Sequence, residues 1–317
     1  MRYEILTMLR EEGEISGERI SEKLNISRAA VSKHIRSLRQ EGYVIDSLPG
    51  KGYRFISSPD ILSPAEIYSH MSNQENWNII TLEEVDSTNI QLRKLADRGA
   101  PEFTVVIAEQ QTAGKGRLGR PWFSPAGSGL WMSVLLRPQL SPQLAQLLTL
   151  TTAVSLEEAF RQLGMDVRIK WPNDILTPGR KKLCGVRSEM HVDMDRVEWL
   201  ILGIGVNINP TAFPRELQDI AISLYQLKGE PIPRAKVAAA ILGRLLANYR
   251  LLQQEGFTSL RTNWLNHALG IGETVAIDQN GVKEEGIALG LDEEGYLLLK
   301  QGDQVKRILA GDMVLSV

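Results

Sequence analysis

The sequence predicts a protein of the α+β class made of three successive domains. The first 60 residues carry three short helical patterns and then two short strands around a turn. From about residue 77, strands and helices follow one another in mixed order, which predicts a mixed sheet with packed helices. From residue 272, short strands alternate with glycines. We expect domains at residues 1–60, 66–268 and 270–317.

The composition is ordinary for a globular protein, with 43% hydrophobic and 23% charged residues among 317. A net charge of −2 excludes a polyanion binder over the whole chain. Cys184 is the only cysteine, so no internal disulfide can form, which suits the cytoplasm. The charged N-terminus argues against a signal peptide, and no run of 18 apolar residues predicts a membrane span.

The N-terminal helical patterns predict a helix-turn-helix. Val31, Ile35 and Leu38 form the i, i+4, i+7 stripe of the last helix, and Ser16 and Ser27 are capping residues. A short break at residues 25–27 separates the second and third helices, which is the spacing of this motif. The three expected helices span Arg2–Glu12, Ser16–Leu24 and residues 28–42.

A β-hairpin is expected next, with strands at residues 43–46 and 52–55, which would complete a winged helix-turn-helix. Residues 26–55 contain six basic and two acidic side chains, a local charge of +4 that favours DNA. The alternative is a small helical protein-interaction module whose charged face is merely solvated. We expect Arg39 to project from the polar side of the last helix, and a linker over residues 59–64. The candidate DNA-binding residues are Gly17, Ser27, Arg28, Ser32, Lys33, Arg36 and Lys51.

The central region carries several strand and helix patterns. Strands are expected at residues 77–84, 104–108, 129–136, 167–170, 181–190 and 197–207. Helices are expected after Asn89 to about Ala96, over residues 144–163 and over residues 233–252. In the last of these, Ala238, Ile241 and Leu245 lie on one apolar stripe.

A glycine-rich loop, GKGRLGRPWF at residues 114–123, fits the G-x-G-x-x-G pattern of a dinucleotide-binding turn. That pattern should open a helix, but Pro121 and Pro125 occupy the first turns. The acidic residue expected about 20 positions later is also missing, because no Asp or Glu lies between Arg120 and Glu157. The loop instead offers Lys115, Arg117 and Arg120 to another anion.

Four polar motifs interrupt the apolar patterns. They are Ser87-Thr88-Asn89, which by itself is compatible with a plain helix N-cap, residues 109–113 before the glycine loop, KWPND at 170–174, which by itself is compatible with an Asx turn, and KKLCG at 181–185. Core packing explains none of them.

The C-terminal residues predict a small SH3-like β-barrel. Five strands are expected, at residues 274–277, 282–289, 296–300, 305–309 and 313–317. Taken alone, this barrel is compatible with a structural cap.

These motifs together closely resemble the biotin protein ligase family. GKGRLGRPWFSP looks like the family's biotin-and-adenylate loop, and KWPND, KKLCG and GIGVNIN (residues 203–209) stand in the family's order and spacing. With the helix-turn-helix in front, essentially the whole chain resembles the family's bifunctional ligases that also repress the biotin operon. The resemblance implies a class II aminoacyl-tRNA-synthetase-like catalytic fold and a C-terminal barrel that helps bind ATP or the acceptor protein.

The resemblance also implies residue roles. Biotin would be bound by Ser87, Thr88, Asn89, Gln111, Lys115, Gly116, Arg117, Lys182 and Gly185, and ATP or the adenylate by Arg117, Arg120, Trp122, Lys170, Asn173, Asp174 and Asn207. Lys182 and Arg117 would be catalytic, and Asp174 would help hold Mg²⁺ with ATP. Lys115 stands where the family usually has Arg, and Cys184 where it has a small residue; we expect Cys184 to have a packing role.

The chemistry fits these residue types. Biotin ends in a carboxylate and ATP is an anion, so fixed cations and Mg²⁺ would offset their repulsion, and neutral polar side chains suit the ureido ring. The expected partners are a biotin carboxyl carrier protein, operator DNA and, with biotinyl-AMP bound, a second copy of the chain. A lipoate–protein ligase and a metabolite-sensing repressor without ligase activity are the alternatives.

Overall fold

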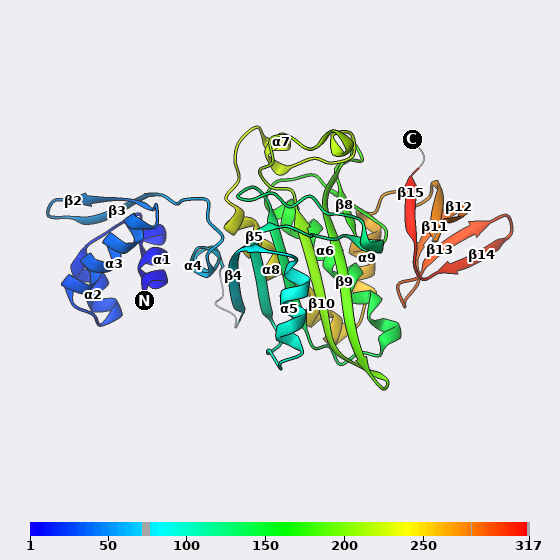
Figure 1. The fold of residues 1–317 in the computed structure, drawn as a ribbon, viewed down its shortest axis with the longest axis horizontal. Coiled ribbons are helices and arrows are strands. Elements are labelled where there is room, and N and C mark those ends of the chain that lie inside the picture. The colour runs from blue at the N-terminus through cyan, green and yellow to red at the C-terminus, as the bar shows by residue number, and fades with distance from the viewer. Residues whose placement is uncertain (72–76, 280, 316–317) are drawn as a thin grey trace. The chain divides into compact units, whose positions relative to one another are not determined.

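The computed structural model describes residues 1–71, 77–279 and 281–315 (Figure 1). The chain divides into two compact units, Met1–Gln74 and Glu75–Val317. The secondary structure is of the mixed α and β class that the sequence predicts. In the part of the chain that the structure describes, no helix combines the length and the apolar character needed to cross a membrane.

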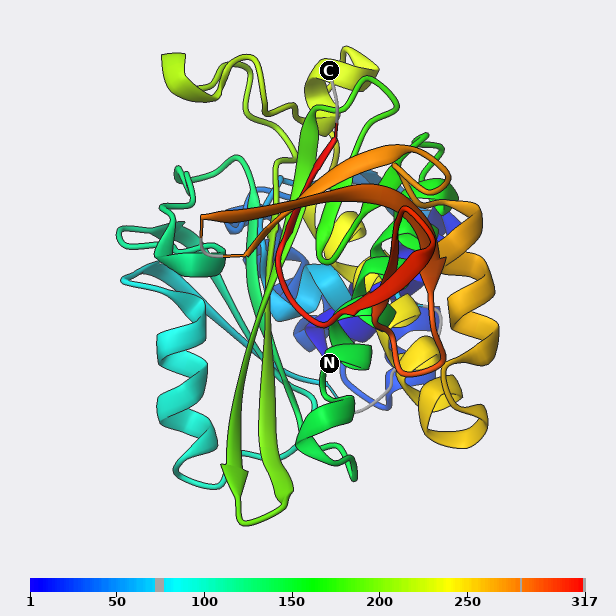
Figure 2. The same cartoon turned by 90° about the vertical axis from the view of Figure 1, so that its right-hand side faces the viewer.

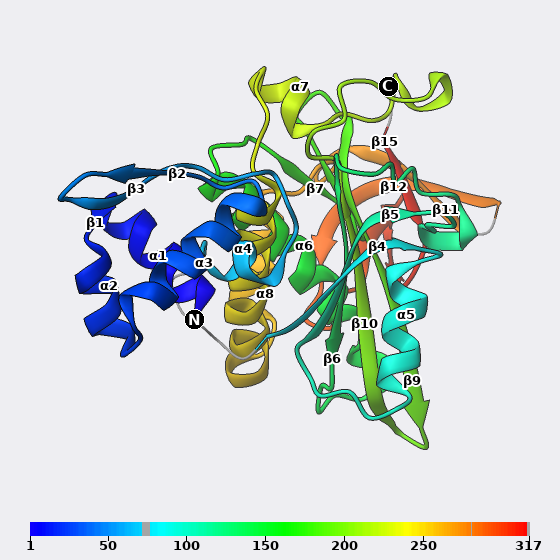
Figure 3. The same cartoon turned by 60° about the vertical axis from the view of Figure 1, so that its left-hand side comes forward.

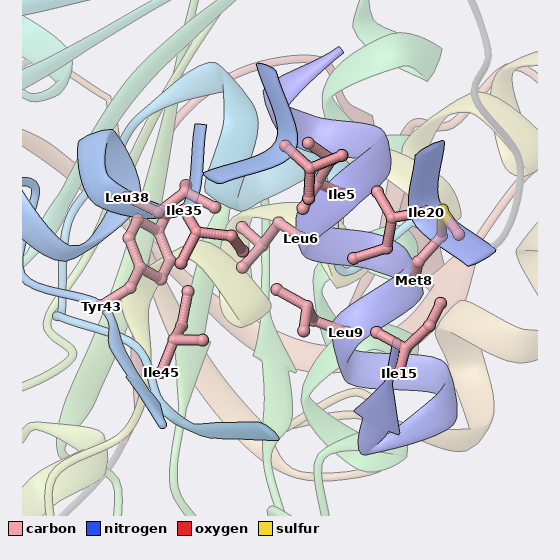
Figure 4. Packing of buried hydrophobic residues seen from close by; sticks show 11 residues of the cluster. Ile5, Leu6, Met8, Leu9, Ile15, Ile20, Ile35, Leu38, Tyr43 and Ile45 are labelled. Atoms are coloured by element: carbon pink, nitrogen blue, oxygen red, sulfur yellow. The ribbon is translucent and has the colours of Figure 1, made fainter. Parts of the chain in front are cut away.

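The first unit contains the predicted helix-turn-helix. Its helices are α1 (Arg2–Glu12), α2 (Gly17–Leu24) and α3 (Arg28–Gln40). The hydroxyls of Ser16 and Ser27 accept capping hydrogen bonds from Arg19 N and Ala30 N, each at 3.1 Å, so both predicted caps are present. Figure 4 shows how the apolar sides of the three helices pack together in one core, which includes Ile5, Leu6, Leu9, Ile20, Ile35 and Leu38.

A three-stranded sheet packs with these helices in the first unit. The predicted hairpin is present as β2 (Val44–Leu48) and β3 (Gly52–Ser57), and the sequence did not predict the short strand β1 (Glu14–Ile15) that pairs with β3. At Gly52, φ is +116°, and a Cβ there would lie 2.2 Å from the carbonyl oxygen of Ile15. Only glycine therefore lets β3 approach β1 this closely.

The segment expected to be a linker ends in a helix, α4 (Pro64–Tyr68), capped by Ser63. Its Glu66 is 2% exposed, forms an ion pair with Arg10 of α1 and accepts a hydrogen bond of 2.5 Å from Tyr43 Oη. Burial alone would raise the pKa of Glu66, but hydrogen bonds from His70, Tyr43 and Arg10 lower it to about 2. Residues 64–71 therefore pack with the first unit, although the sequence placed residues from 66 onward in the central domain.

A seven-stranded mixed sheet forms the centre of the second unit, in the order β4-β5-β6-β10-β9-β8-β7. Among the strand pairs that the structure describes in this sheet, β4–β5 alone is parallel. The strands are β4 (Asn78–Val85), β5 (Thr104–Gln111), β6 (Leu130–Leu136), β7 (Arg168–Lys170), β8 (Asp174–Leu176), β9 (Lys182–Asp193) and β10 (Arg196–Val206). The sequence predicted all of these except β8.

Helices cover both faces of this sheet. Figure 3 shows α5 (Thr88–Ala96) on one face, and α6 (Gln146–Gln162) and α8 (Arg234–Glu255) on the other. Strand β6 is buried along its whole length because both of its faces are covered. The short helices α7 (Leu224–Lys228) and α9 (Thr258–Asn266) were not predicted, and short 3-10 turns lie at Arg117–Gly119, Pro142–Leu144 and Arg215–Leu217.

The C-terminal region forms a separate five-stranded antiparallel sheet in the order β14-β13-β12-β11-β15, drawn in orange and red in Figure 2. Its strands are β11 (Thr274–Gln279), β12 (Val282–Leu291), β13 (Leu297–Gln301), β14 (Gln304–Ile308) and β15 (Asp312–Leu315). The last predicted strand also included residues 316 and 317, which lie outside the described residues.

Candidate active site and its relatives

A cavity of about 660 Å³ in the second unit gathers every residue that the resemblance assigned to biotin or to ATP. This is an ordinary volume for a small-molecule site. The lining comes from the start of α5, the glycine loop, the KWPND segment, β9, β10 and the C-terminal sheet. Segments far apart in the sequence therefore form one site.

One end of the cavity is neutral and hydrogen-bonded. Gln111 Oε1 accepts from Thr88 N at 2.9 Å and from Thr88 Oγ1 at 3.1 Å. The Ser133 hydroxyl lies 2.7 Å from Thr88 Oγ1 and 2.6 Å from Asn89 Oδ1. Ser87 stands at the N-cap of α5, but its side chain makes no capping hydrogen bond. These buried amides and hydroxyls suit an uncharged polar ligand group.

Two glycines of GIGVNIN leave space for the side chains above β10. A Cβ at Gly203 would lie 2.2 Å from Asn89 Oδ1, and one at Gly205 would lie 2.4 Å from Trp122 Nε1. Since real Cβ atoms do not approach this closely, each glycine is required by a specific neighbour. This role of the two glycines was not predicted from the sequence.

The other end of the cavity is charged. Lys182 Nζ lies 2.7 Å from Asp174 Oδ1 and 5.2 Å from the centre of the Trp122 ring. Lys170 Nζ lies 4.0 Å from the Asp174 carboxylate. Burial lowers the pKa of Lys170, although its attraction to Asp174 opposes this effect. Cations and a carboxylate thus lie where two anionic reactants could meet.

Ion pairs join the glycine loop to the last strand. Arg117 lies 2.9 Å from Asp312 of β15 and 3.2 Å from Asn173 Oδ1, and Arg120 lies 2.8 Å from the second oxygen of Asp312. Leu118 adopts φ +53°, and Lys115 pairs with Pro121 across the loop. Asp312 was not predicted from the sequence, because no short-range pattern connects it with Arg117, 195 positions earlier.

Lys115 and Cys184 are the two positions that differ from the residues usual in the family. Lys115 lines the cavity and its side chain is exposed. Cys184 is fully buried, and burial raises the pKa of its thiol, which makes the reactive thiolate less accessible. The neighbouring Gly185 lines the cavity, and a Cβ at this position would lie 3.3 Å from the Lys182 ammonium. Asn207 lines the cavity and donates to the carbonyl oxygen of Ile222 at 3.2 Å.

The candidate DNA-binding side chains lie on the surface of the first unit. The exposed ones are Ser27, Arg28, Ser32, Lys33, Arg36 and Lys51, while Gly17 is half-buried beside the Tyr53 ring. Arg39 is exposed on the polar side of the helix, as expected, and donates to the carbonyl oxygen of Ile45 at 2.8 Å. It fastens α3 to the hairpin.

Together, the fold and the cavity define a two-unit protein with a helix-turn-helix and a site for neutral and anionic ligand groups. Three family models match the chain: an HTH domain over residues 2–54, the Biotin/lipoate A/B protein ligase family over 82–207, and the Biotin protein ligase C terminal domain over 270–316.

The Bifunctional ligase/repressor BirA of Bacillus subtilis is 41% identical to this chain, with 100% of this chain and 99% of that protein covered. The Escherichia coli protein of the same name is 32% identical, with 95% and 92% covered. The solved biotin protein ligase from Aquifex aeolicus, in complex with biotin and ATP, is similar with a TM-score of 0.65 and 32% identity, over 75% of this chain and 97% of that one. The chain therefore belongs to the biotin protein ligase family, in its bifunctional ligase/repressor form.

Proposed function

We propose that this protein is an ATP-dependent biotin–protein ligase that also represses transcription when biotinyl-AMP is bound. The observation that carries this proposal is the division of one cavity into a neutral hydrogen-bonding end and a cationic end. Biotin has the same division, since a neutral ureido ring lies at one end and a carboxylate at the other.

In the first step, a carboxylate oxygen of biotin forms a bond to the α-phosphorus of ATP, and the bond to the β-phosphate oxygen breaks. Biotinyl-AMP forms and pyrophosphate leaves. Lys182 and Arg117 are the catalytic residues, because their fixed charges offset the repulsion between the anions as they approach. Thr88, Asn89 and Gln111 hold the ureido end, and Trp122 covers the ligand.

In the second step, the amine of an acceptor lysine attacks the biotinyl carbonyl carbon and AMP leaves, while the amine proton passes to solvent. The acceptor is a biotin carboxyl carrier protein. Closure of the glycine loop would keep water from the mixed anhydride between the two steps.

Asp174 and Asn173 fit a magnesium ion that enters with ATP. Asp174 Oδ1 is buried and forms an ion pair with Lys182 Nζ at 2.7 Å, so a magnesium ion bound there would replace this internal counter-ion. Phosphate oxygens and water would supply most of the ligands of this Mg²⁺. When bound, Mg²⁺ would neutralise phosphate charge.

For the repressor role, the exposed residues of α3 would enter the major groove and Lys51 would meet phosphate. A biotinyl-AMP-bound homodimer would present two such helices to a two-part operator. We further propose that the C-terminal sheet is an SH3-like barrel, that the catalytic domain has the class II synthetase-like fold, and that the protein works in the cytoplasm. This proposal also includes the boundary between the catalytic domain, which would end at residue 268, and the C-terminal domain, which would begin at residue 270.

One assay tests the ligase. The purified protein is incubated with ATP and either biotin or lipoate, with and without a carrier domain, and adenylate and carrier mass are measured. We expect biotinyl-AMP and biotinylated carrier. Lipoyl-AMP alone would make the protein a lipoate ligase, and tight biotin binding without transfer would make it a sensor.

The repressor role is tested separately by the binding of the protein to its own promoter region, with biotin and ATP present. We expect tighter binding than to random DNA of the same length. Equal binding would contradict this half of the proposal.

A further inference from the structure

Arg187 of β9 lies at the edge of the cavity and connects two parts of the site that the mechanism above treats separately. Its Nη1 donates to the carbonyl oxygen of Gly116 in the glycine loop at 3.0 Å. Its Nε lies 3.1 Å from Glu189 Oε1. The same Glu189 oxygen accepts a hydrogen bond of 2.9 Å from Asn89 Nδ2. Arg187 thus bridges the loop and the biotin pocket.

Strand geometry brings these groups together. Residues two apart on a strand face the same side, so Gly185, Arg187 and Glu189 share the cavity side of β9. Arg187 stands opposite Gly203 of β10, and Gly203 stands opposite Ser133 of β6. Because Gly203 has no side chain, the Asn89 amide lies above β10, between Glu189 on one side and Ser133 on the other.

The bridge fixes the orientation of Asn89. Its amide nitrogen donates to Glu189, and its oxygen accepts from the Ser133 hydroxyl. Arg187 also supplies the counter-charge for Glu189, whose side chain is 23% exposed. Without it, the cation left beside Glu189 would be the more distant and more exposed Arg93, at 4.0 Å, so the carboxylate near the neutral end of the cavity would be only weakly compensated.

The bridge also restrains the loop. The loop's own Lys115 has an exposed side chain and cannot form a planar fork. A guanidinium can direct separate N–H groups to two acceptors, as Arg187 does with Gly116 and Glu189. A lysine ammonium is a point charge at the end of a flexible chain, and therefore holds two such acceptors less well.

We propose that Arg187 is a positioning residue that holds the glycine loop over bound biotin and couples loop closure to the orientation of Asn89. This inference rests on the proposed biotin-ligase function. It predicts that Arg187 controls the affinity for biotin and the retention of biotinyl-AMP, and that it has little effect on ATP binding.

The test compares Arg187→Met, Arg187→Lys and the matched control Arg93→Met in the full-length protein. Arg93 lies 4.0 Å from the same carboxylate, but its side chain is 48% exposed, and among the described residues it forms no hydrogen bond or ion pair with the loop. The measurements are KM for biotin, KM for ATP, kcat, the release rate of biotinyl-AMP and the melting temperature.

For Arg187→Met, we expect KM for biotin and the release rate of biotinyl-AMP to rise about tenfold, the usual effect of losing a charge-assisted hydrogen bond. KM for ATP should stay within about twofold of wild type. Arg187→Lys should recover part of the loss, and Arg93→Met should match wild type.

Two results would overturn the inference. One is a release rate and a KM for biotin that stay within twofold of wild type in Arg187→Met. The other is an equal loss for biotin and ATP together with a lower melting temperature, which would indicate a general structural role. If Arg187→Met does not fold, Arg187→Lys decides by the same criteria. A wild-type protein that makes no biotinyl-AMP would instead contradict the proposed function.

Discussion

The two ends of the cavity are built in different ways. At the neutral end, hydrogen bonds join the buried Thr88, Asn89 and Ser133 to the half-buried Gln111. At the charged end, Lys182 pairs with Asp174, and Arg117 pairs with Asp312. Hydrogen bonds among buried groups fix a shape, whereas ion pairs can be exchanged for those with a ligand. The neutral end is therefore preformed, and the charged end holds internal counter-ions that an anionic substrate can replace.

The largest effect is expected at the charged end, from Lys182→Ala. This change removes a fixed cation and leaves Asp174 without the ammonium that lies 2.7 Å away. Removal of one group that stabilises transition-state charge costs about 100-fold or more. We expect biotinyl-AMP formation to fall by at least that factor, as measured by single-turnover mass spectrometry.

Lys181→Ala is the matched control, because Lys181 Nζ points to the carbonyl oxygen of Gln218 at 3.1 Å. Its rate should remain close to that of wild type. Near-normal turnover in Lys182→Ala would exclude Lys182 as a catalytic residue. It would also contradict the expectation that the charged end has the larger effect on the rate.

The preformed neutral end is tested by Gly203→Ala. The added methyl group would lie 2.2 Å from Asn89 Oδ1, so Asn89 must move away from Ser133. Forcing an atom into a packed site costs about 1–3 kcal/mol, which corresponds to at least about a fivefold loss of biotin affinity. Isothermal titration with biotin measures it.

Gly243→Ala is the control for that experiment, since nothing lies within 4 Å of a Cβ at this helical position. Unchanged biotin binding in Gly203→Ala would show that the neutral end adapts to its ligand, contrary to the comparison above.

A smaller effect is expected from pH at Lys170. Burial disfavours its charged form and lowers its pKa, and a bound anion would favour that form and raise the pKa again. At a pH above the lowered value, ATP binding must therefore take up a proton, so KM for ATP should rise with increasing alkaline pH. In Lys170→Arg the side chain stays charged, and this rise should be several-fold smaller. Identical pH profiles for the two proteins would exclude Lys170 as the titrating group.

The smallest effect is expected from Cys184→Ala. The thiol is fully buried in the core below the cavity, and burial raises its pKa. Turnover should stay within about twofold of wild type, because the loss of one buried sulfur affects packing and not the chemistry. The folded wild-type protein should also resist alkylation by iodoacetamide. Rapid alkylation that abolishes turnover would contradict this assignment.

The sequence was sufficient for much of the fold. Capping serines, apolar stripes and short alternating strands located most helices and strands, because these signals act within a few residues of one another. The elements β1, β8, α4, α7 and α9 were not predicted. Strand β8 has three residues and α4 has five, and such short segments carry too few periods of a hydrophobic pattern to be recognised.

The site was predicted only in part. Its motif residues were found because they are polar side chains in unusual combinations. Ser133, Arg187 and Asp312 were not, because their contacts depend on strand pairing or on the approach of the C-terminal sheet. Arg187 could have been predicted, since it is two residues from Gly185 on β9 and therefore faces the same side of the strand. Ser133 had none, because one hydroxyl in an apolar strand is compatible with ordinary packing.

The buried Glu66 determines where the N-terminal unit can be truncated without loss of stability. A fragment that ended near residue 60 would retain Tyr43 and Arg10 but would lose the carboxylate that binds both of them. A fragment that ends at Met71 keeps this group and the helix that carries it. We therefore expect the shorter fragment to melt at a lower temperature and the longer one to behave as an autonomous module.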